Sequence, residues 1–152
     1  MKQLFGEYEC KIDAKGRMRL PSDLLSQLDQ EGEMTFIINR GSGKYLRLFP
    51  EKVWEVESEK VNQLNPYDKD NMKFIRLFNR GASKITTDSS NRILVKKNLL
   101  EWAGIEKEAI LSTMFNYIEI WSKDNWEMEL TNEPEDFSDL AQKVLGDKKE
   151  SE

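Results

Sequence analysis

The chain has 152 residues and a formal net charge of −5, with 38% hydrophobic and 10% aromatic residues. This apolar content is sufficient for a packed core and excludes a wholly disordered chain. Histidine is absent and Cys10 is the one cysteine, which excludes His-dependent catalysis, His-ligated zinc and an internal disulfide.

The first third of the chain is predicted to form four strands and one short helix. Ser22 is placed to cap a helix over residues 23–28, because a serine oxygen accepts hydrogen bonds from first-turn amides. In the strand before this helix, the two-residue period turns Met18 inward and Arg17 and Arg19 outward. The expected strands span residues 7–12, 17–20, 34–39 and 45–49.

These elements recur in the same order in the second half of the chain. The aligned pairs include Gly6 and Gly81, Asp13 and Asp88, Arg17 and Arg92, Tyr45 and Tyr117, and Trp54 and Trp126. Matching positions of such residue types indicate an internal repeat. The repeat predicts further strands over residues 83–87, 92–95, 109–113 and 117–121. We therefore expect two copies of one unit, at residues 1–60 and 80–130.

A linker helix is expected between the two copies. Asn65-Pro66 is typical of a helix start, with asparagine as the cap and proline at the first helical position. An apolar stripe that includes Phe74 and Phe78 follows this start. We assign residues 61–79 to this linker.

Residues 131–152 are expected to form an amphipathic helix and an acidic tail. Pro134 is placed to start the helix, and Gly146 to end it. The predicted apolar face comprises Phe137, Leu140, Ala141, Val144 and Leu145. Residues 133–152 contain seven acidic and three basic residues, so most of the net negative charge of the chain lies there.

The repeated turns carry an aspartate followed four positions later by an arginine. In the first turn, Gly16 supplies the positive φ that a tight turn needs, and Asn91 takes the same position in the second. One interpretation is that the Asp–Arg pair only closes each hairpin. The repetition of the turn, each time within a cluster of Lys and Arg, favours contact with an anion or DNA.

Four longer segments resemble the MraZ family. They are FGEYECKIDAKGRMRLP at 5–21, NRGASKITTDSSNRILV at 79–95, LLEWAGIEKEAIL at 99–111 and YIEIWSKDNW at 117–126. The resemblance implies an α+β, β-rich fold: a double-split, swapped-hairpin β-barrel built from two AbrB-like repeats, with short helices and a C-terminal helix. Four positions depart from the family pattern. Asn91 stands where glycine is common, Lys96 where proline is common, and Leu25 and Leu100 where arginine or a similar residue is common.

The resemblance also implies a function. MraZ proteins are sequence-specific DNA-binding transcriptional regulators that bind short repeats upstream of the division and cell-wall gene cluster and assemble into rings. The expected partners are therefore double-stranded promoter DNA and further copies of the chain, and the expected place is the cytoplasm, with the nucleoid. The residues predicted to contact DNA are Asp13, Lys15, Arg17, Arg19, Asp88, Arg92 and Lys96.

Two other functions compete with this one. An AbrB/MazE-like antitoxin, whose partner is a toxin protein, is the alternative, although such antitoxins usually carry one hairpin unit and a long tail. An enzyme is disfavoured because the turn aspartates already have a structural role. Asp13 and Asp88 sharing a divalent metal is disfavoured by the arginine that follows each. No cofactor or small-molecule substrate is expected.

The remaining expectations concern the aromatic residues and the membrane. Tyr45, Phe49, Trp54, Trp121 and Trp126 recur at matched positions, which favours packing over base stacking. No apolar run approaches the roughly 18 residues of a membrane span. The first residues also lack the apolar segment of a signal peptide, so we expect a cytoplasmic protein without a membrane partner.

Overall fold

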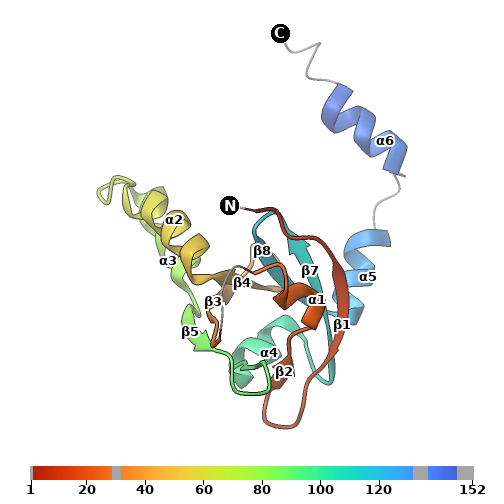
Figure 1. Ribbon diagram of the computed structural model, residues 1–152. Helices are drawn as coiled ribbons and strands as arrows, with labels where there is room; N and C mark the ends of the chain where they lie inside the picture. The colour runs from red at the N-terminus through yellow and green to blue at the C-terminus, as the bar shows by residue number, and fades with distance from the viewer. Residues whose placement is uncertain (1, 29–31, 132–136, 147–152) are drawn as a thin grey trace.

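The computed structural model describes residues 2–28, 32–131 and 137–146 (Figure 1). The strands are β1 (Glu7–Lys11), β2 (Arg17–Arg19), β3 (Thr35–Arg40), β4 (Leu46–Pro50), β5 (Ser83–Thr86), β6 (Arg92–Leu94), β7 (Glu108–Met114) and β8 (Tyr117–Ser122). The helices are α1 (Ser22–Leu25), α2 (Glu51–Asn62), α3 (Lys69–Asn79), α4 (Lys97–Ala103), α5 (Lys123–Thr131) and α6 (Phe137–Ala141). A π-helical segment, η1 (Gln142–Gly146), follows α6 directly.

The two repeats exchange their first strands. The large sheet has the order β1-β7-β8-β4-β3-β5, so β1 of the first repeat pairs with β7 of the second, and β5 of the second pairs with β3 of the first. Replacing each strand by its repeat equivalent reverses this order and leaves it otherwise unchanged. All of these pairings are antiparallel. The predicted α+β fold with swapped hairpins is therefore confirmed.

A second, two-stranded sheet joins the repeats at the end of the molecule where the predicted turns lie. In it β2 pairs with β6, and Met18 lies opposite Ile93. Both side chains are fully buried, as the two-residue period predicts for Met18. They belong to a core cluster that includes Phe36, Leu48 and Ile120 from the large sheet. An isolated bridge between Ile12 and Met18 links the two sheets.

The outer face of the large sheet carries the predicted aromatic residues. Phe49 and Trp121 are buried, and Tyr45 stacks on Trp121 with ring centroids 4.4 Å apart. Trp54 of α2 stacks on Phe78 of α3 at 4.9 Å. Packing against neighbouring rings is therefore confirmed, but these rings form a second layer between sheet and helices outside the main core cluster.

The first helix differs from its prediction. It spans Ser22–Leu25 and not residues 23–28. Ser22 lies inside the helix, and the cap position falls on Pro21, whose side chain makes no capping bond. A serine does cap a helix at the end of the second repeat, where Ser122 Oγ accepts from the Asn125 amide at 3.0 Å.

The linker between the repeats differs from its prediction more than the first helix does. Its helix α3 begins at Lys69 with Asp68 as the cap, whose carboxylate accepts from the Asp70 and Asn71 amides. Asn65 instead closes a turn by accepting from the Tyr67 amide at 3.0 Å. A further helix, α2, precedes this turn and was not predicted from the sequence. Figure 1 shows α2 and α3 lying side by side, projecting from one side of the sheet.

The C-terminal helix is present where it was predicted, and its apolar face is uncovered. Phe137 is 88% exposed and Leu145 is 68% exposed. Figure 1 shows α6 standing away from the body of the protein. The predicted helix start at Pro134 and the acidic tail after Gly146 lie outside the described residues. Among the helices in those residues, none combines the length and apolar character needed to cross a membrane.

Candidate nucleic-acid interface

The first turn is closed by a network around Asp13. One carboxylate oxygen, Oδ1, accepts from the backbone amides of Lys15 and Arg17, each at 2.9 Å. The other, Oδ2, accepts from Arg17 Nε at 2.8 Å. The Gly16 amide donates to the Asp13 carbonyl at 3.0 Å. The Arg17 guanidinium is thus fixed through Nε, with its two terminal nitrogens free of that bond.

The second turn repeats this network around Asp88. Oδ1 accepts from the amides of Ser90 and Arg92 at 2.8 and 3.0 Å, and Oδ2 accepts from Arg92 Nε at 2.8 Å. The Asn91 amide donates to the Asp88 carbonyl at 3.0 Å. The Asp–Arg pairing predicted from the repeat therefore forms in both hairpins with matching geometry.

Both turns adopt the positive φ predicted for them. φ is +88° at Gly16 and +59° at Asn91, a conformation that asparagine tolerates better than most residues with a side chain. The carbonyl at each of these positions accepts from the other repeat: Gly16 from the Val95 amide at 2.9 Å, and Asn91 from the Leu20 amide at 3.0 Å. Each turn is therefore held in place by the strand of the opposite hairpin.

The hydrogen bonds to the turn carboxylates favour their charged form. Amide donation, chiefly from Arg17, holds the pKa of Asp13 below its ordinary value, with some opposition from desolvation. Amide donation, chiefly from Arg92, does the same to the pKa of Asp88. Both carboxylates therefore stay ionised across the physiological pH range and keep their arginines oriented.

The two-stranded sheet places the predicted basic residues on one face. Arg17 lies opposite Leu94, and Arg19 lies opposite Arg92, with the buried Met18–Ile93 pair between them. Since alternate residues of a strand share a face, these four outer residues point away from the core. We call this surface, Arg17, Arg19, Arg92 and Leu94, the arginine face.

The remaining predicted residues flank this face. Lys15 is exposed within the first turn, and Lys96 is exposed just before α4, where it occupies the cap position. Figure 1 shows both turns at the same end of the molecule. Sequence reasoning did not single out Leu94, which is 54% exposed and equivalent to Arg19 in the repeat. The alignment of the two repeats pairs Leu94 with Arg19 and could therefore have identified it.

Comparison with known proteins places this chain in a family. The family model described as "MraZ protein, putative antitoxin-like" matches twice, at residues 4–77 and 78–148, so each match contains one turn. The chain belongs to the MraZ family. A relative from Christiangramia forsetii, named "Transcriptional regulator MraZ", is 43% identical over 147 residues, covering 96% of this chain and 95% of the relative.

Two further MraZ relatives match over nearly their full length. The protein from Flavobacterium psychrophilum is 38% identical over 153 residues, covering 100% of this chain and 98% of the relative. The protein from Caldicellulosiruptor bescii is 38% identical over 141 residues, covering 93% and 96% respectively. Both are named "Transcriptional regulator MraZ". The match to these MraZ proteins thus extends through both hairpins.

We predict that replacing Gly16 by alanine destabilises the protein strongly. A Cβ there would lie 2.6 Å from the Val95 carbonyl oxygen, in addition to the strain of a positive φ. We expect a loss of roughly 2–4 kcal/mol in the free energy of unfolding, measured by urea titration. Gly32→Ala is the matched control, because Gly32 also has a positive φ but open space around its Cβ position. Equal losses in both variants would contradict a close approach at Gly16.

We also predict that the turn carboxylates stabilise the protein only above their ordinary titration range. A pKa lowered by folding gives stability that is present above the unfolded-state value, near 4, and lost as the pH falls through the folded-state value. The wild type should therefore exceed the Asp13→Asn/Asp88→Asn variant in stability at pH 7, and the difference should shrink below about pH 4. Urea titrations across this range measure it. A difference that stays constant with pH would exclude a role for the charge.

Proposed function

We propose that this protein is a sequence-specific DNA-binding transcriptional regulator and that the arginine face contacts the DNA. The observation that carries the proposal is the fixed arrangement of three guanidinium groups on one two-stranded ribbon. Arg17 and Arg92 are each held by an aspartate through Nε, and Arg19 lies beside Arg92. The names of the relatives, transcriptional regulators, support the same function.

The shape of the ribbon suits duplex DNA. The major groove of B-DNA admits a two-stranded β-ribbon, and arginine can donate two hydrogen bonds to a guanine edge or contact phosphates. Asp13 and Asp88 accept hydrogen bonds from the Nε atoms of their arginines. The terminal nitrogens of Arg17 and Arg92 therefore remain available for such contacts. Pre-orientation also reduces the entropy lost on binding.

The arginine face differs between its two halves. Arg19 and Leu94 occupy equivalent repeat positions, so one half ends in a guanidinium and the other in an exposed apolar side chain. Lys15 of the first turn is matched by the neutral Ser90. An apolar side chain suits contact with a thymine methyl group, and a guanidinium suits guanine or phosphate. We therefore expect the protein to prefer an asymmetric site, as short direct repeats provide.

Oligomerisation forms part of the proposal. The positive charge of one arginine face is small against an acidic chain, so the affinity of a single protomer should be modest at physiological salt. Several faces in one ring-shaped homo-oligomer, bound to consecutive repeats, would raise the affinity through effective concentration. We place these repeats upstream of the division and cell-wall gene cluster, and the protein on the nucleoid.

The proposal predicts that loss of either fixed arginine weakens DNA binding. We expect Arg17→Ala and Arg92→Ala each to reduce the affinity for a repeat-containing promoter duplex by about 1–3 kcal/mol, or roughly 5- to 150-fold. A lost phosphate contact would also lower the salt slope by about 1. Fluorescence anisotropy against salt concentration measures both effects.

The matched control is Arg76→Ala, which removes an exposed arginine from α3, outside the arginine face. It should leave the affinity unchanged. Unfolding curves establish that each variant is folded. Binding that is equally tight in wild type, Arg17→Ala and Arg92→Ala would overturn the proposed interface, and tight binding without preference for repeats would overturn the proposed specificity.

A further inference from the structure

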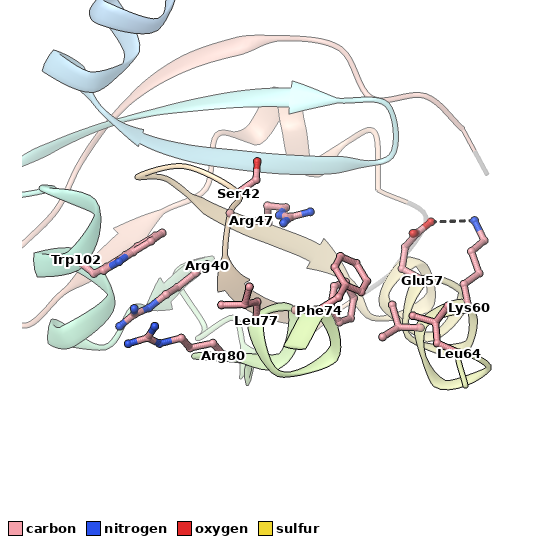
Figure 2. Close-up of a pocket in the computed structure, with 13 residues that line it drawn as sticks. Arg40, Ser42, Arg47, Glu57, Lys60, Leu64, Phe74, Leu77, Arg80 and Trp102 are labelled. Atoms are coloured by element: carbon pink, nitrogen blue, oxygen red, sulfur yellow. Dashed lines mark hydrogen bonds and ion pairs between the residues drawn. The ribbon is translucent and has the colours of Figure 1, made fainter. Parts of the chain in front are cut away.

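A pocket of about 680 Å³ lies between the α2–α3 pair, the end of β3 and α4 (Figure 2). One wall is apolar and open to solvent: Phe74 is 51% exposed and Leu77 is 52% exposed. Val61 and Leu64 of the α2 side continue this wall. The arginine face uses none of these residues, so the pocket is a separate surface of the molecule.

The opposite end of the pocket carries positive charge. The Arg40 guanidinium lies 4.7 Å from the centre of the Trp102 ring, and Lys44 Nζ lies 4.6 Å from it. Figure 2 shows Arg80 alongside Arg40, with both side chains extending in the same direction. Burial, and then the charge of Arg80, lowers the pKa of Arg40. The two like charges repel each other, and an anion bound beside them would offset that repulsion.

Within the described residues, no carboxylate forms an ion pair with Arg40 or Arg80. The Nε of Arg40 is also buried without a hydrogen-bond partner. The Nε of Arg47 is likewise buried without a hydrogen-bond partner, but the Glu119 carboxylate lies opposite Arg47 across the β4–β8 pairing. The uncompensated charge is therefore concentrated at Arg40 and Arg80, beside the apolar wall.

The chain itself contains a segment of complementary chemistry. The C-terminal helix presents an exposed apolar stripe that includes Phe137, Leu140 and Val144, which are 88%, 45% and 58% exposed. Three acidic residues, Glu133, Glu135 and Asp136, immediately precede Phe137 in sequence. An acidic segment followed by an apolar helix matches a pocket with two unpaired arginines beside an apolar wall.

We propose that the C-terminal helix of one copy docks in the α2–α3 pocket of a second copy. Figure 1 shows α6 on the opposite side of the body from α2 and α3. This placement favours the pocket of a neighbouring molecule over that of the same chain. Such a head-to-tail contact is heterologous and generates a ring when the rotation closes. The inference deepens the oligomer of the proposed function, and its test needs no DNA.

The test uses two full-length double variants that each break one half of the contact. The pocket variant is Leu77→Asp/Arg80→Glu, and the helix variant is Leu140→Asp/Val144→Asp. All four residues are exposed in the single chain, so the fold should survive, which circular dichroism and thermal unfolding check. Tyr67→Asp, at a residue 93% exposed between α2 and α3, is the matched control.

Light scattering after gel filtration gives the mass of each species. We expect the wild type and Tyr67→Asp to have several times the 17.8 kDa mass of one chain, and each double variant to have the mass of one chain. An equimolar mixture of the two variants should form a dimer and nothing larger, because it contains one intact helix–pocket contact. Docking within one chain would leave the mixture monomeric and overturn the proposal.

Three other results would also overturn it: a monomeric wild type, assembly that survives in both double variants, or assembly lost in only one of them. Failure here is distinguishable from failure of the DNA proposal. Arg17→Ala should assemble like the wild type, because Arg17 lies on the arginine face and not in the pocket. Loss of assembly in Arg17→Ala would show that the two surfaces are not independent and would contradict the assignment of the pocket.

Discussion

The Val95 amide donates to the carbonyl of Gly16, and the Leu20 amide donates to the carbonyl of Asn91. These two bonds cross between the repeats, and the geometry of the candidate interface depends on them. Each hairpin turn is closed by its own aspartate but is held in place by a backbone bond from the other half of the chain. Met18 and Ile93, fully buried between the two turns, fix the register that brings Arg19 opposite Arg92. The interface is therefore a product of the exchange of hairpins, and one repeat alone would present only half of it.

The same arrangement explains how an acidic chain presents a basic surface. Each turn aspartate orients its arginine, and the two carboxylates are outnumbered by the basic residues of the face and its flanks: Lys15, Arg17, Arg19, Arg92 and Lys96. The net negative charge lies mostly in residues 133–152, distant in sequence from both turns. Separation of charge along the chain thus permits a basic face at one end and, by our inference, an acidic segment and apolar helix that dock in a cationic pocket of a neighbour.

The features that the sequence predicted well are local ones. A positive φ at Gly16 and Asn91, the Asp–Arg pairs and the inward Met18 follow from short-range stereochemistry and the two-residue period of strands. The resemblance to a family supplied the exchange of hairpins, which no local rule contains.

The errors arose where several local signals competed. Asn65 does bond a backbone amide ahead of it, as a cap would, but it closes a turn, and Asp68 caps the helix with two amides. The helix α2 was missed because it follows Pro50 without any side-chain cap. The α2–α3 pocket had no signal in the sequence, because Arg40, Arg80 and Trp102 come from separate segments that only the tertiary structure brings together.

The central claim is that the arginine face binds DNA. Hydrogen–deuterium exchange of the full-length protein, with and without a repeat-containing promoter duplex, tests it most directly. The account predicts that bound DNA slows exchange in peptides covering residues 13–19 and 88–96 and leaves residues 69–79 of α3 unchanged. Slower exchange confined to α3, or no change in either turn under conditions where DNA is bound, would contradict it.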